Sequence, residues 1–185
     1  MAKLTIEDIR KRFELSREFN EIFDAFEQAI QQEILDMELY RLLFWNNSLT
    51  PDELCMFGEK LAKEFPALAY DVYMWLANVF GVTYAMYDNY VLAFEYYTKA
   101  SRARPSAPDP YLEASDCYEP DLNIPSLSSL IDFLKIGLQH VESPKPLYEK
   151  LAHFYDLSGN DEMSKYYRRR ADEKSGESSG QSAAK

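Results

Sequence analysis

Residues 74–107, MWLANVFGVTYAMYDNYVLAFEYYTKASRARPSA, decide the expected fold. Apolar and aromatic side chains recur in them at intervals of three and four, as on one face of a helix. Asp88 and Asn89 separate two helical segments, and Pro105 ends the second. Small residues lie where two antiparallel helices would approach closely: Gly81, Ala93 and Ala100. The stretch therefore predicts a helix hairpin.

The same spacing returns along the chain, which indicates a helical repeat. Residues 42–66 repeat it with looser identities, and further units begin near Tyr111 and Tyr148. The positions equivalent to Gly81 are Leu42, Ser115 and Ala152. One hairpin cannot bury both of its faces, so about four hairpins are expected to stack.

Residues 74–107 resemble the tetratricopeptide repeat at every signature position except the leading aromatic, which is Ala77 here. Tyr84 and Tyr97 stand at the aromatic positions that fill the space between hairpins. The resemblance covers roughly residues 35–175. It implies an all-α fold, a right-handed superhelix of antiparallel helix hairpins. The alternative is an unrelated helical bundle in which the spacing is accidental.

The expected organisation has three parts. Residues 1–34 match no repeat and form an N-terminal helical cap, which starts at Thr5 with Asp8 completing a capping box. Residues 35–175 form the repeat domain, and residues 176–185 form a disordered, low-complexity tail. One apolar stripe predicts helix from Phe19 through Trp45. The other expected helices are 51–65, 68–87, 90–104, 111–118, 127–141, 147–157 and 161–174.

Composition argues against several classes of function. The net charge of −11 repels phosphate backbones, so nucleic-acid binding is not expected. The two cysteines form no metal-binding or disulfide pattern. No apolar run is long enough to insert into a membrane, and the first residues do not resemble a signal peptide. These features predict a cytoplasmic protein without cofactor or metal.

Catalytic residues are scarce. The two histidines, His140 and His153, have no Ser or Cys nucleophile at a recognisable spacing, and they form no HExxH pair. The chain also has no glycine-rich phosphate loop. We therefore expect a protein that is not an enzyme.

The resemblance implies that the first helix of each hairpin lines a concave, partner-binding groove. Its lining is apolar and aromatic in the N-terminal half and mostly acidic in the C-terminal half, which suits an apolar peptide or helix with flanking basic residues. For Trp75 and Tyr40, packing against the N-terminal helices is an equal alternative. The predicted groove residues are Leu39, Tyr40, Leu43, Trp75, Asn78, Val79, Val82, Met86, Leu112, Glu113, Asp116, Lys150 and His153.

One subclass of these repeats clamps the C-terminal carboxylate of heat-shock chaperones with Lys, Asn and Arg side chains. The matching places here hold Leu39, Leu43, Val79, Asp109 and Glu113. Acids stand where cations are needed, so we do not expect that activity.

The expected function is that of an adaptor, scaffold or chaperone-like holder. The alternative is a structural assembly factor that self-associates through its repeat ends, for instance as a homodimer. The basic run Arg168–Arg170 is either a solvated helix face or a contact for an acidic partner.

Overall fold

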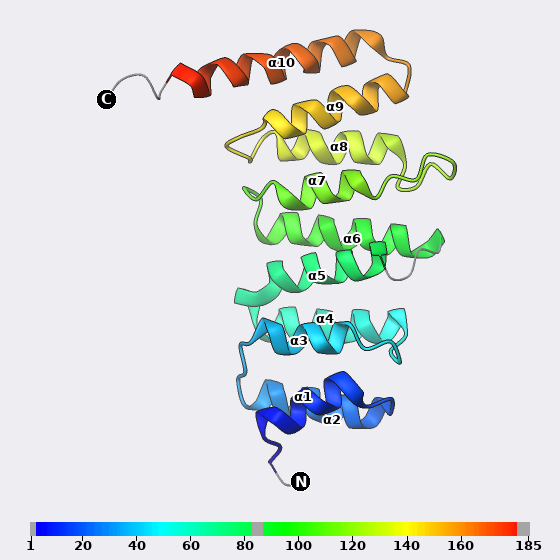
Figure 1. Ribbon diagram of the computed structural model, residues 1–185, viewed down its shortest axis with the longest axis vertical. Helices are drawn as coiled ribbons and strands as arrows, with labels where there is room; N and C mark the ends of the chain where they lie inside the picture. Colours follow the sequence, from blue (N-terminus) through cyan, green and yellow to red (C-terminus); the bar gives the residue numbers. More distant parts are fainter. Residues whose placement is uncertain (1–2, 83–86, 181–185) are drawn as a thin grey trace. The chain divides into compact units, whose positions relative to one another are not determined.

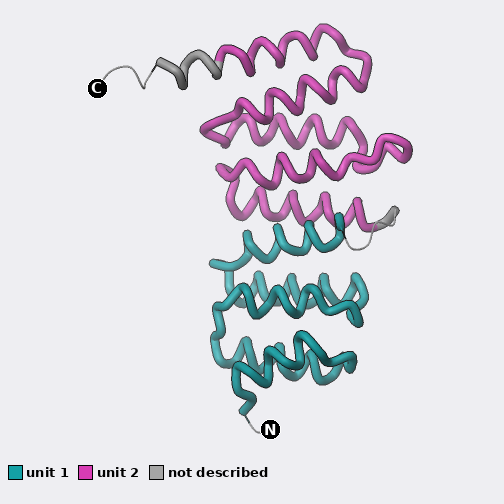
Figure 2. Tube along the Cα trace, in the orientation of Figure 1, with its two compact units in different colours: residues 1–85 teal, residues 86–185 magenta. Residues whose placement is uncertain are grey.

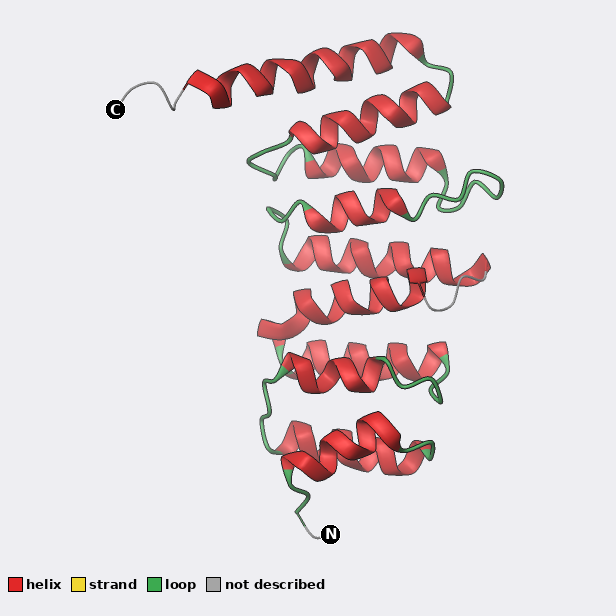
Figure 3. Ribbon diagram, in the orientation of Figure 1, coloured by secondary structure: helices red, strands yellow, loops and turns green. Residues whose placement is uncertain are grey.

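The computed structural model describes the backbone of residues 3–82 and 87–180, and in these residues it is built of helices without a strand element (Figure 3). The chain divides into two compact units, residues 1–85 and 86–185 (Figure 2). An all-α fold is thus confirmed for the described residues. Each unit is described by itself below.

Within residues 3–82, the described part of the first unit, there are five α-helices and one turn of 3-10 helix (Figure 1). Neighbouring helices pack as the pairs α1/α2 and α4/α5, and helices two apart pack as α1/α3 and α3/α5. Contacts between alternate helices are typical of stacked hairpins. The elements are α1 (Ile6–Leu15), α2 (Phe19–Gln31), α3 (Met37–Phe44), α4 (Pro51–Glu64), the 3-10 turn η1 (Pro66–Leu68) and α5 (Ala69–Val82).

The second unit contains five α-helices in its described residues. Each helix packs on the next along the chain, and α7 also packs on α9. An isolated bridge between Glu119 and Ile124 closes the loop that joins α7 to α8. The elements are α6 (Tyr87–Ala103), α7 (Asp109–Asp116), α8 (Leu127–Gly137), α9 (Lys145–Leu157) and α10 (Asp161–Gly180).

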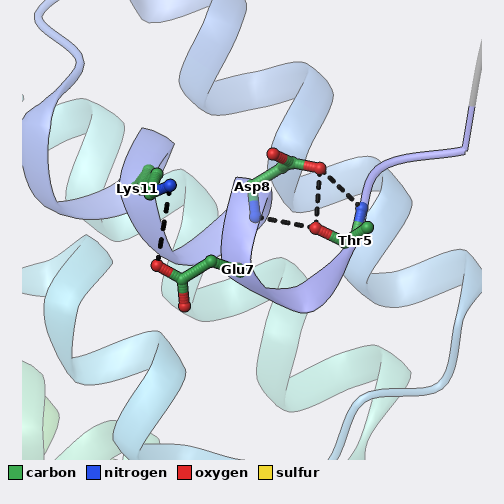
Figure 4. Close-up of polar contacts among 4 residues, drawn as sticks. All are labelled: Thr5, Glu7, Asp8 and Lys11. Atoms are coloured by element: carbon green, nitrogen blue, oxygen red, sulfur yellow. Dashed lines mark hydrogen bonds and ion pairs between the residues drawn. The ribbon is translucent and has the colours of Figure 1, made fainter.

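Helix starts follow the capping signals of the sequence. In Figure 4 the Asp8 amide donates to Thr5 Oγ1 (3.1 Å), and the Thr5 amide donates to Asp8 Oδ2 (3.0 Å). Both bonds satisfy amides that the first turn leaves without a helical acceptor. Thr50 and Glu53 form a second capping box at α4. Ser126 caps α8 by accepting from the Ser129 amide. These three predicted starts are confirmed.

The predicted continuous helix from Phe19 to Trp45 is wrong. The chain leaves the helix after α2, and Glu33 has a φ of 53°. Asp36 then caps α3 by accepting from the Glu38 amide (3.0 Å). Tyr40 donates its hydroxyl proton to the Ile34 carbonyl (2.9 Å), which holds the break in place. The apolar periodicity runs on across the break, and this is why the pattern concealed it.

Three other boundaries differ from expectation. Helix α6 begins at Tyr87, so Asp88 and Asn89 lie within it rather than in a turn. Helix α8 ends at Gly137, and α10 continues to Gly180 through residues assigned to the tail. The connection 83–86, with Tyr84, and residues 181–185 lie outside the described residues. The hairpin expected in 74–107 is therefore divided between the two units.

Aromatic rings join four helices in the core of the first unit. The Phe26 ring meets the Phe57 ring edge to face, with centroids 4.9 Å apart. It also meets the Tyr40 ring at 6.2 Å, and Phe13 meets Tyr40 at the same distance. All four residues are fully buried. Contacts among α1, α2, α3 and α4 thus converge on one aromatic cluster.

Asn46 connects the ends of α1 and α3. Its side chain is buried, and Nδ2 donates to the carbonyls of Phe13 (2.8 Å) and Ser16 (2.9 Å). Its Oδ1 accepts from the amide and hydroxyl of Ser48 (3.0 and 2.7 Å). One amide side chain therefore satisfies polar groups in two segments that are far apart in sequence.

Gly137 permits close packing in the second unit. A Cβ at this position would lie 2.7 Å from Leu147 Cδ2 and 2.9 Å from Tyr111 Cγ. The Tyr111 ring is itself held against Phe133 at a centroid distance of 4.8 Å. The absence of a side chain therefore allows α8 to fit between α7 and α9.

We predict that Asn46→Ala destabilises the first unit by about 2 kcal/mol, because the Phe13 and Ser16 carbonyls lose their donor in a buried place. Urea unfolding, followed by tryptophan fluorescence, measures this loss. The exposed neighbour is the control, since Asn47→Ala should change the free energy of unfolding little. Equal effects of both substitutions would contradict the assigned role of Asn46.

We predict that Gly137→Ala destabilises the second unit by about 1–2 kcal/mol, because steric overlap with Tyr111 and Leu147 exceeds the gain in helix propensity. Thermal unfolding followed by circular dichroism tests this. Asp132→Ala on the same helix removes only an exposed ion pair with Lys135 and serves as the control. A stabilised Gly137→Ala variant would show that the helices do not approach this closely.

Candidate functional site

Four predicted groove residues lie inside the first unit. Leu39, Tyr40 and Leu43 are fully buried, and Val79 is nearly so. For Tyr40 the structure shows the alternative interpretation, internal packing, because its ring lies in the aromatic core. Burial, with Asp36 nearby, raises the pKa of the Tyr40 hydroxyl well above its usual range. A partner cannot reach these four side chains in this conformation, because they fill space between helices.

The other groove residues expected in the first unit lie nearer the surface. Trp75 and Asn78 on α5 are half-buried, and Val82 at its end is 73% exposed. Met86 lies outside the described residues. The accessible part of the predicted site in this unit is thus formed by α5.

Trp75 belongs to a surface cluster that sequence reasoning did not identify. Trp45, directly after α3, is 53% exposed and meets the Trp75 ring edge to face, with centroids 6.1 Å apart. The Arg41 guanidinium lies over the Trp75 ring at 4.6 Å from its centroid, a cation–π contact. We call Arg41, Trp45 and Trp75 the tryptophan cluster. The available signal was that Arg41 and Trp45 are four residues apart, on one helical face.

The tryptophan cluster contains two polar groups without a partner. Trp75 Nε1–H and Arg41 Nε–H are shielded from solvent, and neither has a hydrogen-bond acceptor. A buried donor in this state costs about 1–3 kcal/mol. The Nη1 atom of Arg41 pairs with Glu38, whose side chain is largely exposed. The cluster therefore combines aromatic surface with unmet hydrogen-bonding capacity.

In the second unit the structure brings predicted residues together. Lys150 on α9 forms an ion pair with Asp116 on α7. Leu112 and Glu113 are half-buried on α7, and His153 is exposed on α9. Asp116 and Lys150 therefore lie together where α7 packs on α9.

A cavity of about 360 Å³ lies between α9 and α10. Arg168 forms an ion pair with Asp156 at its edge. Three lining carboxylates outnumber one guanidinium, so the lining side chains carry a net negative charge, and Glu149 also pairs with Lys145 outside the cavity (3.7 Å). The predicted groove included His153 but no residue of α10, because only the first helix of each hairpin was expected to line it. The lining residues are Glu149, Ala152, His153, Asp156, Arg168, Ala171 and Asp172.

Contacts within the second unit engage two residues of the basic run Arg168–Arg170. Arg168 pairs with Asp156, as described above. Arg170 pairs with Glu173 (3.0 Å) and lies over the Tyr148 ring at 5.6 Å. Arg169 is exposed. The run therefore supports the packing of α10 more than it offers a free cationic patch.

Tyr97 is a buried residue that contacts Glu113, one of the predicted groove acids. Its hydroxyl donates to Glu113 Oε2 at 3.5 Å, and its ring is buried. Burial raises the pKa of the Tyr97 hydroxyl well above the usual range, and the neighbouring Cys117 and Glu113 raise it further. Tyr97 is thus a neutral donor that orients a groove carboxylate.

Among the described residues, no group of three His, Cys, Asp or Glu side chains is arranged to hold a metal ion. None of the described helices is both long and apolar enough to cross a membrane.

Comparison with known proteins adds little. No protein-family model matches the chain, and no curated protein matches it. A solved structure named MamA MSR-1 C2 is similar, with 21% sequence identity over 93% of this chain and 95% of that chain, at a TM-score of 0.48. Such a low score leaves the fold to be argued from the helices of this chain.

We predict that Tyr97 remains protonated at about pH 11, where ordinary tyrosines ionise. Absorbance at the tyrosinate band should therefore follow the same curve up to that pH in the wild-type chain and in Tyr97→Phe. In guanidinium chloride the two curves should differ by one of the fourteen tyrosines. A difference between the folded chains would show that Tyr97 is accessible.

Proposed function

We propose that this chain is a non-enzymatic protein-interaction module of the tetratricopeptide type. It holds an apolar peptide or helix, flanked by basic residues, against the first helices of its hairpins. The observation that carries the proposal is the cavity between α9 and α10, which is lined by Glu149, His153 and Asp172 among others. Asp116 on the neighbouring α7 adds a further acid, paired with Lys150. The module would serve as an adaptor, scaffold or chaperone-like holder in the cytoplasm, without cofactor or nucleic acid.

The packing of alternate helices supports this function. In each unit, first helices contact one another directly: α3 with α5, and α7 with α9. A row of parallel helices exposes a repeating set of side chains along its length, which is suited to an elongated guest.

The chemistry of the cavity indicates a basic guest. A Lys or Arg side chain could lay its aliphatic stem on Ala152 and Ala171 and place its charge near Asp172 and Glu149. Arg168 is already neutralised by Asp156, so it opposes such a guest little. The field of a chain with net charge −11 would also speed the approach of a basic segment.

Apolar contacts would come from the first helices of the second unit, where Leu112 is half-buried on α7. Leu39, Tyr40, Leu43 and Val79 have no part in the proposed surface, because they are buried.

Binding of a fluorescent amphipathic peptide of alternating Leu and Lys tests the proposal. We expect fluorescence anisotropy to show binding that weakens as salt is added. Asp172→Asn should weaken it about tenfold, which corresponds to one lost charge contact. Leu112→Asp, on α7 of the same unit, should weaken it with helicity retained. Asp132→Asn, an exposed acid on α8, is the control. If neither added salt nor Asp172→Asn changed the affinity for the peptide, the proposed site would be overturned.

The exposed face of α10 favours one alternative, self-association. Tyr166 is 43% exposed there, beside the exposed Lys165 and Arg169. If this face joined two copies through a repeat end, sedimentation velocity would show a dimer that grows with concentration. A monomer at all concentrations would remove this alternative.

A further inference from the structure

The tryptophan cluster of the first unit offers hydrogen-bond donors, whereas the acidic cavity of the second unit offers acceptors. Trp75 Nε1–H and Arg41 Nε–H have no acceptor within the chain. Both belong to one contact, since the Arg41 guanidinium lies 4.6 Å from the Trp75 ring centroid. The ligand that complements two adjacent donors carries oxygen acceptors.

The charge of Arg41 selects among such acceptors. Glu38 occupies Nη1 and leaves Nε without a partner. A guanidinium can bind two carboxylates along different edges, and a carboxylate is the acceptor that matches its charge and planar shape. The ligand is therefore expected to contain an Asp or Glu side chain.

Access to these donors requires only a small rearrangement. Arg41 is held by an ion pair with Glu38, whose side chain is 71% exposed, and pairs of this kind are weak. Rotation of the Arg41 side chain would uncover part of the Trp75 ring, over which its guanidinium lies. Trp45, 53% exposed, provides an aromatic platform beside it for an apolar side chain. Trp and Arg are the residues most enriched at binding hot spots.

We infer that the tryptophan cluster is a docking site for a protein segment in which an acidic residue stands next to an apolar one. The carboxylate pairs with Arg41 Nε and accepts from Trp75 Nε1–H, and the apolar side chain packs on Trp45. The charge preference is opposite to that of the proposed basic-peptide surface, and the two sites lie in different units. This inference goes beyond the proposed function and can succeed or fail separately.

The chain provides its own reporter for this site. Its only two tryptophans are Trp45 and Trp75, so intrinsic tryptophan fluorescence reports on the cluster alone. The probe is the blocked peptide Ac-GLELEG-NH2. The two comparison peptides replace Glu by Gln or by Lys.

We expect the Glu peptide to change tryptophan emission with saturation, and the Gln peptide to bind about tenfold more weakly because it has lost the charge. The Lys peptide should not bind. Arg41→Lys keeps the charge and removes the Nε donor, and it should weaken the Glu peptide by about tenfold. Arg17→Lys, at an exposed arginine of the same unit, is the matched control and should have no effect.

Trp45→Ser, at an exposed position, gives a second test that does not depend on the folding of Arg41→Lys. It should weaken the Glu peptide, as followed by the remaining Trp75. Equal binding of the Glu and Lys peptides, or no emission change at millimolar peptide, would overturn the inference. Emission that changes with protein concentration alone would also overturn it, since the occupant would then be a second copy. The two proposals can be told apart. If the Glu peptide does not bind but the Leu–Lys peptide binds in a way that depends on Asp172, this inference fails and the proposed function stands.

Discussion

The burial of both apolar faces of each helix hairpin is the constraint on which this structure depends. A single pair of short amphipathic helices has more apolar surface than its two members can cover. In the first unit α3 must therefore contact α1 and α5, and in the second α7 must contact α9. This requirement places the first helices of successive hairpins next to one another. The candidate binding surfaces consist of the side chains that remain exposed on these helices.

The sequence predicted most elements because local signals agree with the packing. The capping residues Thr5, Thr50 and Ser126 each begin a helix. It did not predict the break before α3, where the Asp36 cap competes with an uninterrupted apolar stripe. The period of an apolar stripe indicates which face of a helical segment is buried. It does not indicate whether that segment is one helix or two.

The candidate site could be predicted only in part. The alignment of repeats placed Asp116 and Lys150 on one surface, where they form an ion pair. It also placed Leu39, Tyr40 and Leu43 in a groove, although they are buried beneath it. A helix face is wider than one row of residues, so a one-position error in register exchanges a lining residue for a core residue. Trp45 was missed because its role depends on a contact with Trp75, which is distant in sequence. Arg168 was noticed only as part of a basic run, and its ion pair with Asp156 was not foreseen.

The central claim is that the first helices of the second unit receive a basic, apolar guest. Amide chemical-shift mapping with the Leu–Lys peptide tests it most directly, because each residue reports separately. The account predicts that the shifts cluster on α7, α9 and the facing side of α10, with Asp116, His153 and Asp172 among the largest. Shifts confined to α8, or spread evenly over both units, would contradict it.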